Sequence, residues 1–322
     1  MPVDANIDTT DLPLIDPNTG PLKMAVEDKR ITLYTKAIID LDKPCRIKYH
    51  PLTFNRCSVW VTGRLTKNYR CHVAIDTGCW ALGALSWSVI RENKLPIYPI
   101  EIEEKVFDGF CYLPVLQVGE AKIREVGCLC MNKELDRQFF GMPVNRIRRV
   151  LLGLQLLKEF RYILVDGVHK ELMLSAEQSF TPMQDDQWLQ YPLKIEEYPK
   201  GGLRLMIDIP IGGKTYHIQL DTGSDGALTV DTKFFDELSK SITATVKKRK
   251  GKDLFLIGWV DCQKVVLPEL DFCHRILKNA QISILPDDMA GKYTNLVGMQ
   301  CFKDTVMVLD FERELMWVKQ HN

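Results

Sequence analysis

Apolar and polar residues alternate along much of this chain with the two-residue period of a β-strand. A clear case is 57–63, which is followed after a polar turn by a second apolar run at 71–75. The same arrangement returns at 203–209 and 216–220. Alternation bounded by turn residues is typical of paired strands. We therefore expect a mainly β protein in which two similar hairpins recur.

Helical periodicity is restricted to short segments, in which apolar residues recur at intervals of three and four. The fold is therefore expected to contain few short helices. They are predicted at 86–93, 154–160, 232–239 and 299–303.

Both second apolar runs lead directly into the tripeptide Asp-Thr-Gly, which begins at Asp76 and at Asp221. Each tripeptide is followed by two apolar residues and a glycine, Gly153 and Gly298, at the same distance (153 − 76 = 77 and 298 − 221 = 77). Two motifs in equal register indicate an internal repeat with a period of 145 residues. A unit of this length has the size of a small domain.

The repeat and the length of 322 residues predict two domains. We expect an N-terminal arm at 1–30, a first lobe at 31–177, a linker at 178–188 and a second lobe at 189–322. Pro182 and a scarcity of apolar residues mark the linker.

Charge and composition exclude several classes of partner. Lys plus Arg equals Asp plus Glu at 42 each, so no net charge attracts nucleic acid or an anionic membrane. The short basic clusters at 146–149 and 247–250 are interpreted as solvated loops. The first 23 residues contain no apolar segment typical of a secretory signal or a membrane span. We expect a cytoplasmic protein that binds neither nucleic acid nor membranes.

The ten cysteines are scattered through strand-like runs without the spacing of a disulfide framework, which indicates reduced thiols. Cys128 and Cys130 form the only tight pair, and on a strand both side chains point to one face. Zinc sites favour longer spacings and further ligands. We interpret the pair as core packing and expect no metal.

Asp-Thr-Gly at a strand end, a Leu-Pro strand at 112–119 and again at 265–272, the apolar-apolar-Gly signal and a closing strand together resemble the retropepsin-like aspartic proteases. The chain is similar to two such units fused in tandem, which is the plan of the pepsin family. The resemblance covers about 43–175 and 189–318. It implies two β-barrel lobes related by a pseudo-two-fold axis.

The resemblance implies that Asp76 and Asp221 are the catalytic carboxylates, one from each lobe, with Gly153 and Gly298 behind their loops. Two adjacent carboxyls share a proton and titrate as a pair. The ionised member takes a proton from a water molecule, and the protonated member donates to the peptide carbonyl. This chemistry needs neither a metal nor a cofactor.

The same resemblance assigns supporting roles to the rest of each tripeptide. Thr77 and Thr222 would exchange hydrogen bonds between the lobes. Gly78 and Gly223 would allow the backbone to approach the carboxylates closely. Ser224 would bond the outer oxygen of its carboxylate.

Three residues depart from the family pattern. Cys79 stands at the position of Ser224 in the first lobe and is only a weak donor. Trp80 and Asp225 occupy positions where small neutral residues are commoner. We expect the indole to narrow the cleft and the third carboxylate to raise the pKa values of the dyad.

His72 and His217 each precede their aspartate by four residues, which is about 13 Å along a strand. Neither can act as a base for its own aspartate, and both are interpreted as surface or sheet-packing residues. Aromatic residues beside glycines at 105–110 and 251–259 indicate either mobile lids or ordinary hairpins.

The predicted function is that of an aspartic-type endopeptidase, a monomeric hydrolase that cleaves a peptide or protein substrate in a cleft formed by both lobes. The alternative is a catalytically silent pepsin-like fold that binds a peptide or protein partner. Retention of two mutually repelling carboxylates favours the enzyme. A third arrangement pairs each lobe with its twin in another molecule, but the short linker favours pairing within one chain.

Overall fold

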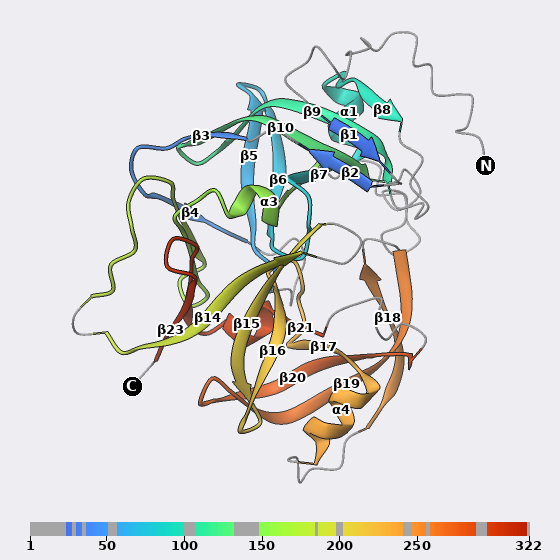
Figure 1. Cartoon of the computed structure of the whole chain (residues 1–322), viewed down its shortest axis with the longest axis vertical. Coiled ribbons are helices and arrows are strands. Elements are labelled where there is room, and N and C mark those ends of the chain that lie inside the picture. Colours follow the sequence, from blue (N-terminus) through green and yellow to red (C-terminus); the bar gives the residue numbers. More distant parts are fainter. Residues whose placement is uncertain are drawn as a thin grey trace.

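The described part of the molecule is mainly β, as the alternation predicts, with few short helices. The chain forms two groups of strands that lie one above the other in Figure 1. The computed structural model describes residues 24–27, 30–33, 37–50, 57–99, 107–131, 148–183, 186–197, 202–240, 247–255, 258–287 and 295–320.

Six strands of the first half form a closed ring, which we call the N-terminal barrel. Their order is β10-β7-β11-β6-β5-β9, and β9 pairs with β10 to close the ring. The pairs β6–β11 and β7–β10 are parallel, and the other neighbours are antiparallel. The strands are β5 (Trp60–Thr66), β6 (Tyr69–Asp76), β7 (Gly83–Leu85), β9 (Phe107–Val118), β10 (Ala121–Met131) and β11 (Arg149–Gly153).

Six strands of the second half form the C-terminal barrel in the order β20-β17-β21-β16-β15-β19, closed by β19 on β20. Its parallel pairs, β16–β21 and β17–β20, correspond to those of the first ring. The second barrel therefore repeats the strand order and directions of the first. The strands are β15 (Leu203–Ile211), β16 (Lys214–Asp221), β17 (Leu228–Asp231), β19 (Gly258–Phe272), β20 (Arg275–Leu285) and β21 (Leu296–Gly298).

Burial along the strands follows their hydrophobic pattern. In β5, Val61 and Leu65 are buried and alternate with exposed residues, because successive side chains point to opposite faces. All five residues of β11 are buried. A parallel strand covered on both faces is expected to be continuously apolar, which explains the Val-Leu-Leu run after Arg149.

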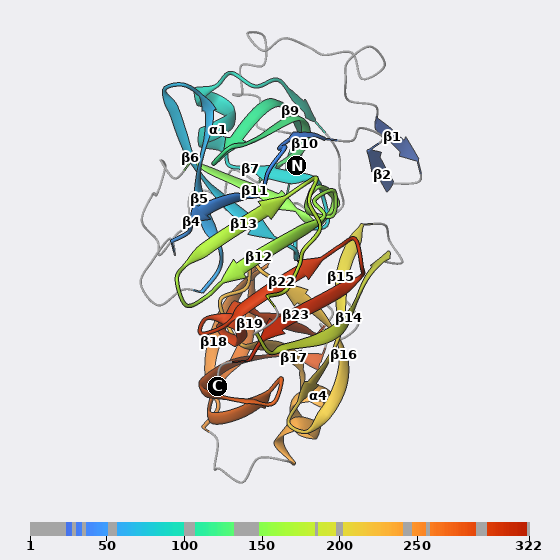
Figure 2. The ribbon, with the colours of Figure 1, turned by 90° about the vertical axis from the view of Figure 1, so that its left-hand side faces the viewer.

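Six strands join the two halves in the order β14-β23-β22-β12-β13-β4, and β14 also pairs with β15 of the C-terminal barrel. In Figure 2 these strands face the viewer and lie between the two barrels. β12 and β22 pair antiparallel with Leu164 opposite Val308, and each of these residues lies two positions before an aspartate, Asp166 or Asp310. The junction is therefore symmetric. The strands are β4 (Cys45–Lys48), β12 (Tyr162–Asp166), β13 (Glu171–Ser175), β14 (Trp188–Glu197), β22 (Val306–Asp310) and β23 (Leu315–Lys319).

The helices lie at the predicted places but are shorter in three of the four cases. The segment predicted at 232–239 is α4 (Thr232–Ser239), whose first turn is capped by the Asp231 carboxylate at 2.7 Å from Phe234 N. The others are α1 (Trp87–Glu92), α3 (Leu154–Leu157) and the single 3-10 turn η2 (Met299–Phe302). Of the helices described, none is long and apolar enough to cross a membrane.

The predicted linker contains one large anchoring side chain. Phe180 is buried, and its ring lies 5.5 Å from that of Tyr162, 5.4 Å from that of Trp188 and 5.6 Å from that of Trp317, measured between centroids. The edge-to-face geometry of these pairs is favourable. This segment is therefore packed on the strands that join the two halves.

The remaining strands extend the barrels or stand apart. β1 (Met24–Glu27) and β2 (Arg30–Leu33) pair only with each other, and β3 (Ile38–Asp40) pairs with β10. β8 (Ile97–Pro99) pairs with β9, and β18 (Arg249–Phe255) pairs with β19. Both predicted lid segments belong to these last hairpins. Their tips, 100–106 and 256–257, lie outside the described residues.

Candidate active site

The two Asp-Thr-Gly loops begin where β6 and β16 end, with Asp76 and Asp221 as the last residues of the strands. A parallel strand lies beside each of them. Gly153 of β11 is opposite Asp76, and Gly298 of β21 is opposite Asp221. The equal spacing of the two motifs therefore reflects the same strand pairing in both barrels.

These two glycines are required by close packing behind the loops. A Cβ atom at Gly153 would lie 2.1 Å from the carbonyl oxygen of Ala81, and one at Gly298 would lie 2.4 Å from that of Gly226. Backbone atoms cannot yield at such distances without moving the loop. The glycines thus allow each Asp loop to lie directly on its supporting strand.

Thr77 and Thr222 bind the two loops to each other. The Thr77 hydroxyl donates to the Leu220 carbonyl at 2.7 Å and accepts from Thr222 N at 3.0 Å. The Thr222 hydroxyl donates to the Ile75 carbonyl at 2.6 Å and accepts from Thr77 N at 3.0 Å. Both threonines are fully buried, so four hydrogen bonds hold the loops at a fixed separation without competition from water.

Gly78 and Gly223 bring each loop against the carboxyl group of the other. A Cβ atom at Gly78 would lie 2.5 Å from Asp221 Cγ, and one at Gly223 would lie 2.5 Å from Asp76 Oδ1. Any side chain at either position would therefore displace a carboxyl group.

Backbone amides of the loops stabilise the two carboxyl groups. Asp76 Oδ1 accepts from Gly78 N at 3.0 Å and from Cys79 N at 3.1 Å, and Asp221 Oδ1 accepts from Gly223 N at 2.8 Å. Each carboxyl group also lies against the glycine of the other loop, so the two groups are close enough to influence each other's pKa. Two like charges this close repel each other, which favours a proton on one of the two groups.

The surroundings raise the pKa of both carboxyl groups. Burial is the largest cause for Asp76, whose pKa lies well above its ordinary value, and the neighbouring Asp221 charge raises it further. Burial also raises the pKa of Asp221, whereas the Gly223 amide and the bond from Asp76 act in the opposite direction. The pair therefore holds a proton at pH values where an exposed aspartate is ionised.

The fourth loop residues, Cys79 and Ser224, make matching backbone contacts. The Cys79 carbonyl accepts from Leu154 N at 2.7 Å, and the Ser224 carbonyl accepts from Met299 N at 2.9 Å. The contact of Ser224 with the Asp221 carboxylate comes from its backbone N–H. Burial, and next the Asp76 charge, raises the pKa of the Cys79 thiol, so this cysteine stays protonated and unreactive.

The fifth loop residues each reach the opposite half of the molecule, a role that the sequence did not reveal. Asp225 Oδ1 accepts from Cys57 N at 2.9 Å, from Ser58 N at 2.8 Å and from the Ser58 hydroxyl at 2.7 Å. Trp80 lies against Gly202, where an added Cβ atom would be 3.1 Å from the Trp80 Cβ. The two contacts are equivalent under the repeat of 145 residues, because Trp80 corresponds to Asp225 and Cys57 to Gly202. Once one of the contacts is known, the repeat predicts the other.

His72 and His217 lie outside the dyad. His217 hydrogen-bonds to the carboxylates of Asp208 and Glu196 at 2.5 and 3.0 Å. Asp208, followed by Glu196, raises the pKa of His217. His72 is half-buried and lies beside the ring of His50, with centroids 5.7 Å apart.

Within the described ranges, no group of three or more His, Cys, Asp or Glu residues is arranged to hold a metal ion. Cys128 and Cys130 are buried on β10, where Cys111 lies directly opposite Cys128. Burial, followed by a hydrogen bond with Cys130, raises the pKa of Cys111 well above its ordinary value. These thiols are core residues, and all ten cysteines of the chain are free.

No protein family model matches this chain, and no curated protein matches it. Among solved structures, it is similar to conglutin gamma, a basic 7S globulin from lupine seeds. The identity is 11% and the TM-score 0.47, over 87% of this chain and 95% of that one.

Proposed function

We propose that this protein is an aspartic-type endopeptidase in which Asp76 and Asp221 act together on one water molecule. The observation that carries the proposal is that two half-buried carboxyl groups from different barrels lie against each other's loops, with the pKa of both raised. Their loops are fixed to each other by the paired bonds of Thr77 and Thr222. A binding protein gains nothing from two half-buried acids that repel each other when both are ionised.

The dyad supplies both proton transfers of peptide hydrolysis. The ionised carboxylate takes a proton from the water molecule while the water oxygen attacks the peptide carbonyl carbon. The protonated carboxyl donates to the carbonyl oxygen, which gives a neutral tetrahedral intermediate. Its collapse breaks the C–N bond, a proton passes to the leaving nitrogen, and the dyad returns to its singly protonated form.

The raised pKa values of the two carboxyl groups support this division of work. The group that donates to the substrate must be protonated at the pH of the reaction, and burial with a neighbouring negative charge favours that state for Asp76. Amide donors from Gly223 and Ser224 favour the charged state of Asp221. Because the two groups are coupled, the proton belongs to the pair, and it moves between them during turnover.

The architecture also supports a pepsin-like enzyme. Each barrel contributes one aspartate from the end of the equivalent strand, β6 or β16, and β12 and β22 join the halves symmetrically. We propose two retropepsin-like lobes related by a pseudo-two-fold axis, which form one cleft for a peptide or protein substrate. The hydrogen bonds between Thr77 and Thr222 arise within one chain, so a monomer contains the whole dyad.

The test is peptide cleavage by purified protein. A peptide library is incubated across the acidic to neutral pH range with the wild type, Asp221→Asn and Asp225→Asn, and new peptide termini are identified by mass spectrometry. We expect cleavage by the wild type and by Asp225→Asn, and its loss in Asp221→Asn.

A folded wild type that cleaves no peptide at any pH would contradict the proposal. If the same protein retained library peptides on a column, and Asp221→Asn retained them equally well, the silent peptide-binding fold would be the correct interpretation.

A further inference from the structure

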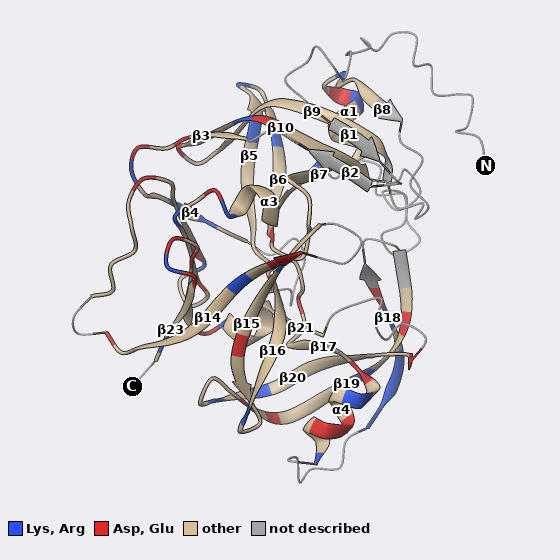
Figure 3. Ribbon diagram, viewed as in Figure 1, with Lys and Arg blue, Asp and Glu red and all other residues tan. Residues whose placement is uncertain are grey.

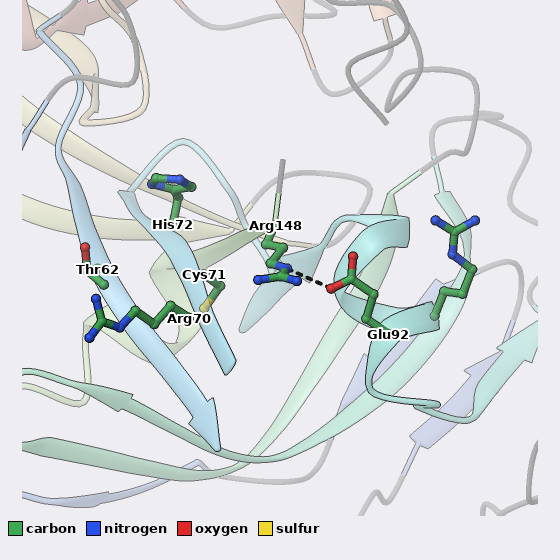
Figure 4. Close-up of a pocket in the computed structure, with 7 residues that line it drawn as sticks. Thr62, Arg70, Cys71, His72, Glu92 and Arg148 are labelled. Carbon is green, nitrogen blue, oxygen red and sulfur yellow. Dashed lines mark hydrogen bonds and ion pairs between the residues drawn. The ribbon is translucent and has the colours of Figure 1, made fainter. Parts of the chain in front are cut away.

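A cavity lies on the outside of the N-terminal barrel. Its volume is about 930 Å³, and it is centred on β6 near His72, four residues before Asp76. Figure 4 shows Arg70, His72 and Arg148 around this cavity, with Glu92 bonded to Arg148. The residues that line it are Thr62, Arg70, Cys71, His72, Arg91, Glu92 and Arg148.

Strand register concentrates positive charge on this face. In the β5–β6 pair, Thr62 lies opposite His72 and Arg64 lies opposite Arg70, so the four side chains share one face of the sheet. Both arginines are exposed, and Figure 3 shows basic residues on β5 and β6. Like charges directly opposite each other destabilise a strand pair unless a counter-charge is present.

The adjoining elements add further cations and one acid. Arg148 forms an ion pair with Glu92 at 2.7 Å and lies 4.6 Å above the Tyr69 ring. Arg149 is buried on β11 opposite His72, so the solvated loop predicted for this basic cluster is wrong at Arg149, whereas Arg148 is exposed and precedes the strand. Among the described residues, Glu92 is the single carboxylate that lines the cavity, and Arg70 forms no ion pair.

One nitrogen of the His72 ring has no hydrogen-bond partner among the described residues. This atom, Nδ1, is buried. Burial, followed by the charges of His50 and Arg149, lowers the pKa of His72. A buried polar atom without a partner is costly, so this face of the barrel is not optimised for the stability of the ligand-free protein.

The equivalent face of the C-terminal barrel has the opposite arrangement. His217 stands one repeat after His72, and Asp208 lies opposite it where Thr62 lies opposite His72. Asp208 and Glu196 both bond His217, so this face carries its own counter-charge. Among the described residues, the N-terminal face has no carboxylate paired with His72, which lies opposite Thr62.

We propose that the cavity of the N-terminal barrel is a binding site for a small organic anion with phosphate or carboxylate groups. Guanidinium groups bind such anions through paired, charge-assisted hydrogen bonds, which Arg70 and Arg148 supply. The Thr62 hydroxyl and the His72 ring add neutral hydrogen bonds. The ligand provides the negative charge that Asp208 and Glu196 provide on the other barrel.

The size of the cavity restricts the ligand. Sites for small molecules have volumes of roughly 300–1,000 Å³, and this cavity lies in the upper part of that range. It is much larger than one phosphate or carboxylate group. The ligand is therefore a molecule with at least two anionic groups or with an uncharged body beside one such group.

Isothermal titration calorimetry at low salt tests the site with two probes, inorganic pyrophosphate and citrate. We expect one of them to bind once per chain and more weakly as salt is added. Binding of pyrophosphate alone identifies a phosphate ligand, and binding of citrate alone identifies a carboxylate ligand. This readout does not depend on peptide hydrolysis, so its outcome is separate from that of the proposed function.

Arg70→Gln is the informative variant, because the Arg70 side chain is exposed and forms no ion pair with any described residue. It should weaken binding about tenfold, and the Arg70→Gln/Arg148→Gln variant should weaken it further. The matched control is Arg249→Gln, which removes the same charge from an exposed position on β18. No heat with either probe up to ~1 mM, or an equal loss of affinity in Arg70→Gln and Arg249→Gln, would overturn the proposal.

Discussion

The two Asp-Thr-Gly loops are identical in three residues and different in the next two. The identical residues contact the other loop: the threonines exchange hydrogen bonds and the glycines face the opposite carboxyl groups. After them, Cys79-Trp80 in one loop corresponds to Ser224-Asp225 in the other. Symmetry is therefore retained where the loops meet each other and is lost where each loop meets the rest of the chain.

The fifth residues show what this difference does. Trp80 and Asp225 occupy equivalent positions and reach equivalent positions of the opposite half, Gly202 and Cys57. One contact is an aromatic ring on a glycine, and the other is a carboxylate that accepts three hydrogen bonds. The two halves are thus joined symmetrically in geometry but with different chemistry, and only one side places a third charge near the dyad.

The largest expected effect is the loss of catalysis in variants of the two aspartates, which we propose act as one unit. Asp76→Asn and Asp221→Asn should each lower kcat/KM at least about 10³-fold, because each removes half of the proton transfers. The double variant should be scarcely worse than either single variant. Peptide cleavage with circular dichroism as the folding control measures this. If one single variant were folded and kept wild-type turnover, the two aspartates would not act as one unit.

The threonines provide a test of structural symmetry. Thr77→Val and Thr222→Val each leave a buried N–H and a buried carbonyl without a partner, so each should lower the free energy of unfolding by about 2–3 kcal/mol. The losses should be similar in the two variants and less than additive in the double variant. Chemical denaturation measures them.

Thr229→Val is a suitable control for that experiment. Thr229 is buried on β17, and its hydroxyl makes no hydrogen bond to a described residue. It should cost clearly less than the loop variants. Equal losses at all three positions would indicate that the bonds between the loops contribute little.

Removing the charge of Asp76 should stabilise the protein at neutral pH. Its folded-state pKa lies above the ordinary value of 3.8, so folding favours the protonated group and stability falls as pH rises through the folded-state pKa. Asp76→Asn should therefore raise Tm at neutral pH by about 2–4 °C, as expected for ~1 kcal/mol. The gain should vanish below pH 3.8.

Asp310→Asn gives the contrasting result in the same thermal scans. Asp310 is buried and forms an ion pair with Arg313 at 2.8 Å, so loss of its charge should lower Tm. A lower Tm for Asp76→Asn at pH 7 would contradict the repulsion inferred for the dyad.

The smallest effect is expected from the charge that breaks the symmetry. The Asp225 charge raises the Asp221 pKa, but its effect is smaller than those of burial and of the hydrogen bonds to Asp221. Asp225→Asn should therefore move the alkaline limb of the pH profile of kcat/KM slightly to lower pH. Asp208→Asn, which changes a carboxylate on the outer face of the same barrel, should leave that limb in place. A shift to higher pH in Asp225→Asn would show that its hydrogen bonds outweigh its charge.

Local pattern was sufficient to place most elements that carry the candidate site. The strands that end at Asp76 and Asp221 were predicted because alternation and turn residues act over a few neighbours. The helix at 232–239 was predicted to the residue, since Asp231 caps it locally. The helix predicted at 154–160 ends at Leu157. Its leucines are already buried after one turn, so burial does not require a longer helix.

The sequence by itself determined the repeat, the mainly β class and the positions of the two carboxylates, all of which depend on residue order. Tertiary structure alone decided that Asp225 binds Ser58, that Phe180 anchors the expected linker and that Arg149 is buried beside His72. The first two of these contacts join residues more than a hundred positions apart. Such contacts depend on how two barrels close and meet, and no local propensity encodes that.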